Sequence, residues 1–309
     1  MRNGRRLGRR VMEAITILLQ CRLFAGLAQE ALAQLARLCV TVEVAGGDRL
    51  FSAGELANSL YIVVTGRLRA LRPDGSVAGD IDRLEVIGEI SLLTGEPRSA
   101  EVYALRDSVL LRIQREQFLK FATAHPSALL EISRVVISRM RQNQRRTPFA
   151  SQRTMQTLTL LPADPTLDLD SFATALGAAL PHGARRIGVN EVDKALGPGA
   201  AQTPFDHSTE NRRLVDWLSA GEVGERRPLY CATGLPDAWT ERCIRQADRI
   251  LVIARERQRP ESSFVSPMLR RLKPRVPIEL VMLHDADGTL PSVAPWRTSS
   301  AGRTSSSGA

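Results

Sequence analysis

The spacing of apolar positions is helical near the start of the chain, becomes strand-like, and then turns helical again. In residues 30–39, "EALAQLARLC", apolar residues recur every three or four positions, which predicts a helix. Between residues 40 and 114, alternating or β-branched runs are separated by Gly-containing turns, as in a small antiparallel barrel or jelly roll. Helical spacing resumes at Pro126, which suits the first turn of a helix, after a similar segment at 115–125. Residues 11–146 are therefore predicted to form a β-roll (jelly roll) with flanking helices.

A second domain, placed at 154–291, is predicted after a linker at 147–152. Strand-like and helical segments alternate in it, a pattern typical of an α/β domain with a mainly parallel sheet. Residues 292–309 have no periodicity and are expected to be disordered. Polar residues predict two helix N-caps, at Asp168 or Asp170 and at Ser208 or Thr209. The predicted strands are 154–163, 184–190, 227–233, 249–255 and 277–283, and the predicted helices are 168–181, 208–221 and 237–248.

Composition agrees with two globular domains, because the chain has 309 residues of which 43% are hydrophobic. No apolar run approaches the ~20 residues that a membrane-spanning helix needs. The Arg-rich start is similar to a signal peptide, but Glu13 and Gln20 interrupt its apolar part and no small-residue cleavage site follows. We therefore expect a basic, frayed start that leads into a short helix, and a cytoplasmic protein for which a membrane-peripheral position stays open.

The cysteines and histidines are scattered, so neither residue type predicts a metal site. The four cysteines fit free thiols in a reducing compartment. The net charge is +9, carried largely by arginine and concentrated at the N-terminus and around 139–146. Such a charge is compatible with an anionic membrane surface or a nucleic acid as partner, and equally with a solvated surface.

One short segment, "IGEISLLTGEPRSAEV" (87–102), carries the most specific chemistry. It predicts a loop with one or two helical turns that end at Gly95, and the free N–H groups at the helix start suit an anion. The guanidinium of Arg98 matches a phosphate, and Ser99 adds a hydroxyl donor. The carboxylate of Glu89 is a suitable acceptor for a ribose hydroxyl. A cyclic nucleotide has both groups. The alternative is an Arg–Glu pair that holds together the loop of a roll without a ligand.

This segment resembles the phosphate-binding cassette of the cyclic-nucleotide-binding domains, as in catabolite activator protein and the regulatory subunits of cyclic-nucleotide-dependent kinases. The turn "GDRLFSAGE" and the strand "LYIVVTGRLRA" resemble the same family, and the resemblance covers about residues 18–141. It implies that Glu89 binds the ribose 2′-hydroxyl and that Arg98 binds the cyclic phosphate with support from Ser99. Ala100, where cyclic GMP binders often have Thr, favours cyclic AMP over cyclic GMP. The ligand-binding residues so implied are Gly88, Glu89, Ile90, Arg98, Ser99 and Ala100.

The second domain resembles the region before the catalytic domain in bacterial patatin-like phospholipases related to neuropathy target esterase. The string "WTERCIRQADRILVIAR" (239–255) carries most of this resemblance. It implies a module that couples nucleotide binding to a lipid-esterase domain. No P-loop motif G-x-x-x-x-G-K-[ST] is present, so we expect shared architecture without nucleotide hydrolysis.

The sequence contains neither the G-x-S-x-G motif nor the glycine-rich oxyanion loop of a patatin domain. We therefore expect a catalytically silent regulatory chain, and the abrupt end of the resemblance near Trp296 suggests a truncation or a shifted reading frame. The alternative is a cyclic-AMP-responsive transcription regulator with an atypical output domain. DNA binding is not expected, because the segment after the linker begins with a strand and shows no compact helix-turn-helix. The oligomeric state stays open.

Overall fold

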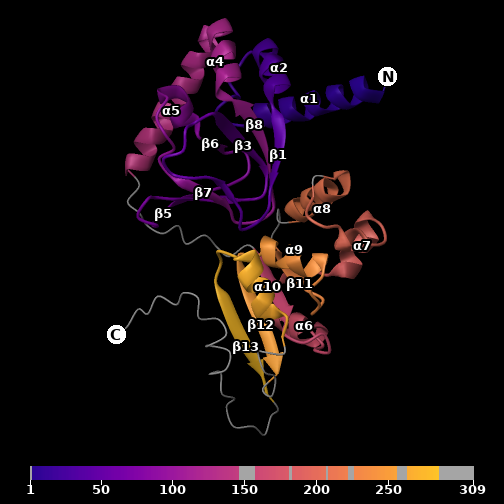
Figure 1. Cartoon of the computed structure of the whole chain (residues 1–309). Coiled ribbons are helices and arrows are strands. Elements are labelled where there is room, and N and C mark those ends of the chain that lie inside the picture. Colours follow the sequence, from indigo (N-terminus) through magenta and orange to yellow (C-terminus); the bar gives the residue numbers. More distant parts are fainter. Residues whose placement is uncertain are drawn as a thin grey trace. The chain divides into compact units, whose positions relative to one another are not determined.

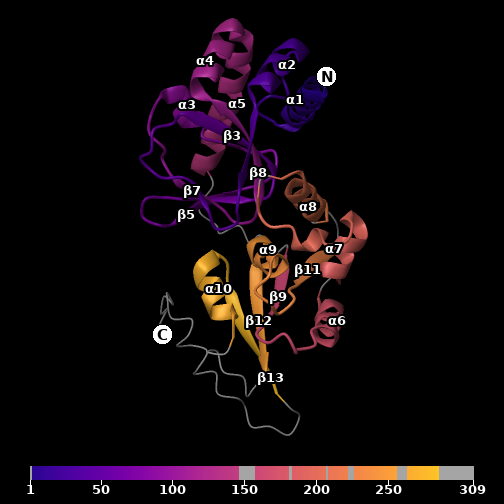
Figure 2. The same cartoon turned by 45° about the vertical axis from the view of Figure 1, so that its right-hand side comes forward.

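The computed structural model describes residues 2–145, 157–180, 183–206, 208–221, 226–255 and 263–284. The predicted linker at 147–152 and the predicted tail at 292–309 lie outside this range. By its internal contacts the chain divides into two compact units, Met1–Thr154 and Met155–Ala309, and each is described by itself (Figure 1 and Figure 2).

In the first unit the strands form an antiparallel β-roll, which confirms the predicted jelly roll. Among the described residues, one sheet has the order β1-β8-β3-β6 and the other the order β2-β7-β4-β5. The strands are β1 (Val40–Val44), β2 (Arg49–Phe51), β3 (Ser59–Thr65), β4 (Leu68–Leu71), β5 (Val77–Ile81), β6 (Val86–Ile87), β7 (Glu101–Ala104) and β8 (Ser108–Gln114).

Helices flank the roll, and in both ribbon views α2 and α4 lie on the same side of it (Figure 1 and Figure 2). The helices are α1 (Arg2–Gln20), α2 (Gln29–Leu38), α3 (Glu89–Thr94), α4 (Arg115–Ala124) and α5 (Pro126–Arg145). The prediction for the N-terminus was wrong in length, because α1 is one helix of 19 residues instead of a frayed start with a short helix. Arginine is a good helix former, and Ala14 and Leu18 anchor the end of α1 in the core.

Strand β3 contributes side chains to two apolar cores, one on each of its faces. Leu60 and Ile62 face a core shared with the helices, and Val63 faces a second core between the sheets. Because successive side chains of a strand point to opposite faces, one strand contributes to both cores. This packing holds the start of β3 and the end of β6 in place, and the candidate site lies next to them.

The second unit is an α/β domain with a parallel sheet, as predicted. Its described strands are all parallel and have the order β10-β11-β9-β12-β13. The strands are β9 (Leu158–Pro162), β10 (Ala184–Ile187), β11 (Arg227–Cys231), β12 (Arg249–Arg255) and β13 (Ile278–Leu283). The helices are α6 (Asp170–Ala179), α7 (Val189–Leu196), the 3-10 turn η1 (Ala200–Gln202), α8 (Thr209–Ala220), α9 (Ala238–Gln246) and α10 (Val265–Leu272).

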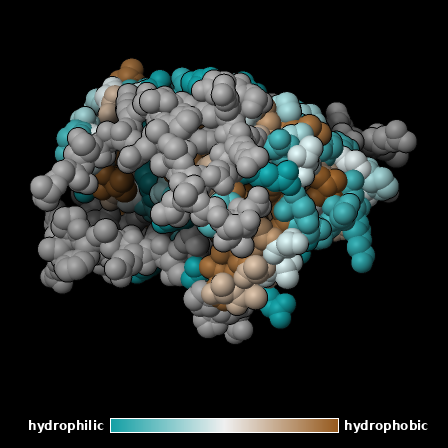
Figure 3. All heavy atoms as spheres, turned by 90° about the horizontal axis from the view of Figure 1, so that it is seen from below, coloured by the Kyte–Doolittle hydropathy of each residue, from teal (hydrophilic) through white to brown (hydrophobic). Residues whose placement is uncertain are grey.

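Helices cover the two faces of this sheet unequally. The core on one face joins α7, α8, α9 and α10, whereas α6 contributes to the core on the other. Alternate residues of β12 serve the two cores, Ile250 one and Leu251 the other. The edge strand β13 has no fully buried residue. Figure 3 shows the molecule from below, and among the described residues on that face hydrophobic surface lies beside hydrophilic surface.

Two helices of this unit were not predicted. Both α7 and α10 are only 8 residues long, and the predicted strand 184–190 overlaps the start of α7 at Val189. The predicted N-cap of α6 was also wrong, because its N-cap is Leu169 and no side chain caps it. Asp168 instead accepts a hydrogen bond from the backbone N–H of Asp170. Ser208 caps α8 as predicted, accepting from the N–H of Asn211.

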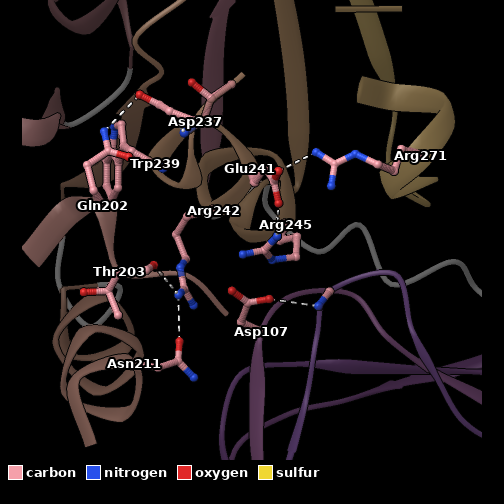
Figure 4. Close-up of polar contacts among 12 residues, drawn as sticks. Asp107, Gln202, Thr203, Asn211, Asp237, Trp239, Glu241, Arg242, Arg245 and Arg271 are labelled. Carbon is pink, nitrogen blue, oxygen red and sulfur yellow. Dashed lines mark hydrogen bonds and ion pairs between the residues drawn. The ribbon is translucent and has the colours of Figure 1, made fainter. Parts of the chain in front are cut away.

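Polar contacts around α9 include a capping residue that sequence reasoning did not single out. The carboxylate of Asp237 accepts hydrogen bonds from the N–H of Thr240 at 2.8 Å and from Thr233 Oγ1 at 2.8 Å. It also accepts from Gln202 Nε2 at 2.9 Å (Figure 4). Nearby, the fully buried Arg242 donates to Asn211 Oδ1 at 2.7 Å. Asp237 therefore joins the start of α9 to both the preceding loop and η1.

The substitution Asp237→Ala is expected to destabilise the protein by about 1–3 kcal/mol, because a helix cap and two side-chain donors lose their acceptor. Urea denaturation followed by circular dichroism measures this change. The control Ser208→Ala removes only one capping bond and should cost about 1 kcal/mol. Equal losses in the two variants would show that the additional contacts of Asp237 contribute nothing.

Candidate functional site

The candidate site lies in the loop that joins β6 to β7, and its local fold follows from two glycines. The six-residue helix α3 starts after Gly88, which has φ 84°, and ends before Gly95, which has φ 79°. Both values lie in the left-handed region that glycine adopts without strain. The predicted short helix ending at Gly95 is therefore confirmed.

Arg98 is buried at this loop, with a relative exposure of 4%. Its Nη2 donates to the carbonyl oxygen of Ser59, and its Nη1 donates to the carbonyl oxygen of Gly88 at 3.4 Å. Its Nε is also buried, and no acceptor for it is found among the described residues. The guanidinium therefore donates to two main-chain oxygens, while its Nε–H is left for a further acceptor.

The electrostatic surroundings of Arg98 combine burial with nearby acidic groups. Burial lowers the pKa of Arg98 below its ordinary value, whereas the charges of Tyr61, Glu55 and Glu89 act in the opposite direction. Glu89 is itself buried, with an exposure of 8%. A carboxylate and a guanidinium therefore lie near one another in a partly desolvated place, where hydrogen bonds to a charged ligand are stronger than in water.

Glycine at position 88 is required by close approach as well as by its φ angle. A Cβ atom built there would lie 2.0 Å from Nη1 of Arg98. The absence of a side chain thus lets the guanidinium reach the start of α3. The glycine of the Gly-Glu pair is therefore explained by the geometry of the loop as well as by the resemblance of the motif to a known family.

The other predicted site residues border the same loop, and the hydrogen bonds of the Arg98 guanidinium go to Ser59 and Gly88 and not to them. Ile90 is 36% exposed at the first turn of α3, and Ser99 is exposed next to Arg98 whereas Ala100 is half-buried. Gly88, Glu89 and Arg98 are brought together by the fold. Ile90, Ser99 and Ala100 border the loop and stay predicted ligand-binding residues.

Sequence reasoning missed several residues that shape the loop. Ser91 donates through Oγ to the carbonyl oxygen of Pro97 at 3.3 Å and so spans the loop. Ser59 supplies a carbonyl oxygen to Arg98, and Phe51 lies under its guanidinium. Phe51 stands in the "GDRLFSAGE" turn that carried part of the resemblance, and this turn was the available signal.

Other reactive groups do not form a competing site in the described part of the chain. The four cysteines form no disulfide, and burial raises the pKa of Cys39 to about 12 and that of Cys231 to about 11. These thiols are therefore protonated at neutral pH and poor nucleophiles. Among the described residues, no His, Cys, Asp or Glu side chains gather in a group of three that could hold a metal. The searched residues also contain no helix of the length and apolarity needed to span a bilayer.

In the second unit, the loop after the central strand β9 is acidic. This is the position of the phosphate-binding loop in P-loop proteins, which uses glycine amides and a lysine. Here Asp164 accepts from both the N–H and the hydroxyl of Thr166, and these hydrogen bonds lower the pKa of Asp164. The loop therefore offers carboxylates where a phosphate would need donors.

Family models match both units. Residues 41–125 match the cyclic nucleotide-binding domain, and residues 154–299 match the neuropathy target esterase family P-loop like domain. The first unit is thus a cyclic nucleotide-binding domain. It is followed in the same chain by a P-loop-like domain of the neuropathy target esterase type.

Named relatives have the same two-part region. The chain is 28% identical to mouse "Patatin-like phospholipase domain-containing protein 7" over 278 residues, which is 81% of this chain and 20% of that protein. It is 31% identical to "Lysophospholipase NTE1" of Candida albicans over 281 residues, 82% of this chain and 20% of that protein. The chain therefore spans about a fifth of the length of these relatives. Among solved structures it is similar to the catabolite activator protein of Thermus thermophilus, with 28% identity over 40% of this chain and 60% of that one and a TM-score of 0.37.

Proposed function

We propose that this chain is a regulatory protein that binds a cyclic nucleotide, cyclic AMP in preference to cyclic GMP. The ligand would lie against the loop between β6 and β7 and be bound by Gly88, Glu89, Ile90, Arg98, Ser99 and Ala100. The observation that carries the proposal is the buried guanidinium of Arg98, whose Nε–H has no acceptor in the described structure. Leaving a buried donor unsatisfied costs free energy, and an anionic phosphate oxygen would supply the acceptor.

The division of roles follows from charge. Arg98 would neutralise the cyclic phosphate, with the hydroxyl of Ser99 and the amides at the start of α3 as further donors. Glu89 would accept a hydrogen bond from the ribose 2′-hydroxyl. A ligand that lacks either group should therefore bind more weakly. The preference for cyclic AMP rests on Ala100 alone, which offers no hydroxyl to a guanine.

The second unit is proposed to pass the nucleotide signal to a lipid-esterase domain. The relatives are called phospholipases and lysophospholipases, and they match this chain over about a fifth of their length. The acidic loop after β9 argues against nucleotide hydrolysis by this unit, because carboxylates repel a phosphate. An anionic membrane surface stays a candidate second partner because of the arginines in α1.

Binding is tested by isothermal titration calorimetry with cyclic AMP and cyclic GMP on the full chain. The comparison with 2′-deoxy cyclic AMP separates the proposed role of Glu89 from that of Arg98, since this ligand keeps the phosphate and lacks the hydroxyl. No heat and no competition up to millimolar ligand would overturn the proposal. DNA-fragment shift assays with and without ligand test the transcription-regulator alternative.

A thermal-melt experiment provides an independent measurement. At a ligand concentration of 100 times the dissociation constant, the folded state should gain about 2.7 kcal/mol by mass action, and the melting temperature of the first unit should rise. Adenosine, which lacks the phosphate, is the control and should shift the melt far less. A shift of equal size with adenosine would mean that Arg98 contacts no phosphate.

A further inference from the structure

The guanidinium of Arg98 lies over the face of an aromatic ring. Its central carbon is 4.2 Å from the centroid of the Phe51 ring. Phe51 in turn stacks against Tyr61, with ring centroids 6.1 Å apart and an angle of 29° between the ring planes. A cation over the face of an aromatic ring is attracted by the ring quadrupole, and this attraction grows when the pair is desolvated.

The turn that contains Phe51 also holds the main chain of Arg98. The N–H of Arg98 donates to the carbonyl oxygen of Glu55 at 2.8 Å, and the N–H of Gly54 donates to the carbonyl oxygen of Arg98 at 2.8 Å. The turn itself is closed by the Glu55 carboxylate, which accepts from the N–H of Ser52 at 3.0 Å. One short segment, residues 51–55, thus fixes both the backbone and the side chain of Arg98.

Stacking constrains the guanidinium in a way that suits an anion. The N–H groups lie in the plane of the guanidinium, so a ring on its face leaves them available for acceptors at its edge. The contacts to the carbonyl oxygens of Ser59 and Gly88 are such edge contacts. A long side chain that is already ordered loses less conformational entropy when a ligand binds.

From these contacts we propose that Phe51 is a positioning residue for Arg98, which holds the guanidinium plane ready for the phosphate. The inference rests on the proposed cyclic-nucleotide function and adds a residue to its site. Phe51 need not touch the ligand for this role. Its effect passes through Arg98 and should vanish when Arg98 is absent.

The test compares Phe51→Leu and Phe51→Tyr in the full chain by calorimetry with cyclic AMP. Leucine keeps an apolar side chain but has no π face, so affinity should fall about three- to tenfold. Tyrosine keeps the ring and should restore affinity to within about twofold of the wild type. In an Arg98→Ala background, Phe51→Leu should change affinity by less than about twofold, because the group it positions is gone.

Phe51 is also a core residue, so stability needs its own control. Leu110 packs in the same apolar cluster as Phe51, and Leu110→Val should lower stability while leaving affinity unchanged. If Phe51→Leu binds as tightly as the wild type, or if Leu110→Val loses affinity to the same extent, the positioning role is overturned and the binding function stands. If the wild type binds no cyclic nucleotide at millimolar concentration, the proposed function fails first.

Discussion

Replacing Arg98 with alanine is expected to lower the affinity for cyclic nucleotide about ten- to a hundredfold. A hydrogen bond to a charged group contributes roughly 1.5–3 kcal/mol, and the buried Arg98 is the residue proposed to bind the cyclic phosphate. The measurement is calorimetric titration with cyclic AMP, supported by circular dichroism to show that the variant is folded.

The size of this effect separates a ligand contact from a structural one. Among the described residues, the guanidinium of Arg98 donates to the main-chain oxygens of Ser59 and Gly88, so a purely structural role predicts lost stability with unchanged affinity. Arg72→Ala is a matched control, because Arg72 is an exposed arginine of the same roll whose bonds are to its own hairpin. If a folded Arg98→Ala protein binds cyclic AMP as tightly as the wild type, Arg98 does not bind the phosphate.

Replacing Gly66 with alanine is expected to destabilise the protein by about 2–5 kcal/mol, the largest loss of stability predicted here. Gly66 has φ 91°, and a Cβ atom there would lie 2.2 Å from Ser108 Oγ, 2.6 Å from Ser108 Cα and 2.7 Å from the carbonyl oxygen of Asp107. Two of these atoms belong to the main chain and cannot rotate away. Overpacking costs about 1–3 kcal/mol, and the left-handed backbone adds about 1–2 kcal/mol for a residue with a Cβ.

Gly75 provides a control that shares the backbone conformation but lacks the clash. Its φ is 81°, and a Cβ atom there would meet no atom within 4 Å. Gly75→Ala should therefore cost only about 1–2 kcal/mol. Chemical denaturation of both variants in the full chain measures the difference, which isolates the close approach of Gly66 to Ser108. Equal losses would mean that the start of β8 at Ser108 moves aside without cost.

The prediction of the first unit succeeded where local pattern and tertiary structure coincide. The β-branched run of β3 predicts a strand, and in the structure its residues divide between two cores. The short helix α3 was predicted from the glycines and proline around it. The start of the chain was misjudged, because a run of arginines says little about whether the apolar residues behind it will find a core.

In the second unit, the rhythm of strands and helices predicted the class of fold but not the order of the strands. The inner strands β9, β11 and β12 are buried on both faces, so the pattern of their residues does not indicate which strand lies beside them. The short helices α7 and α10 were missed for a related reason. Eight residues give too few turns for a helical period to stand out.

The sequence by itself determined the chemistry of the candidate site. A Gly-Glu pair, an Arg-Ser pair and the helix-ending Gly95 between them predict a carboxylate and a guanidinium on one loop with a short helix. The tertiary structure alone decided how the guanidinium is held. The carbonyl oxygen of Ser59 lies 39 positions away along the chain, and the ring of Phe51 reaches Arg98 from another strand. No local pattern encodes such contacts, because they form only when the whole roll closes and brings distant strands together.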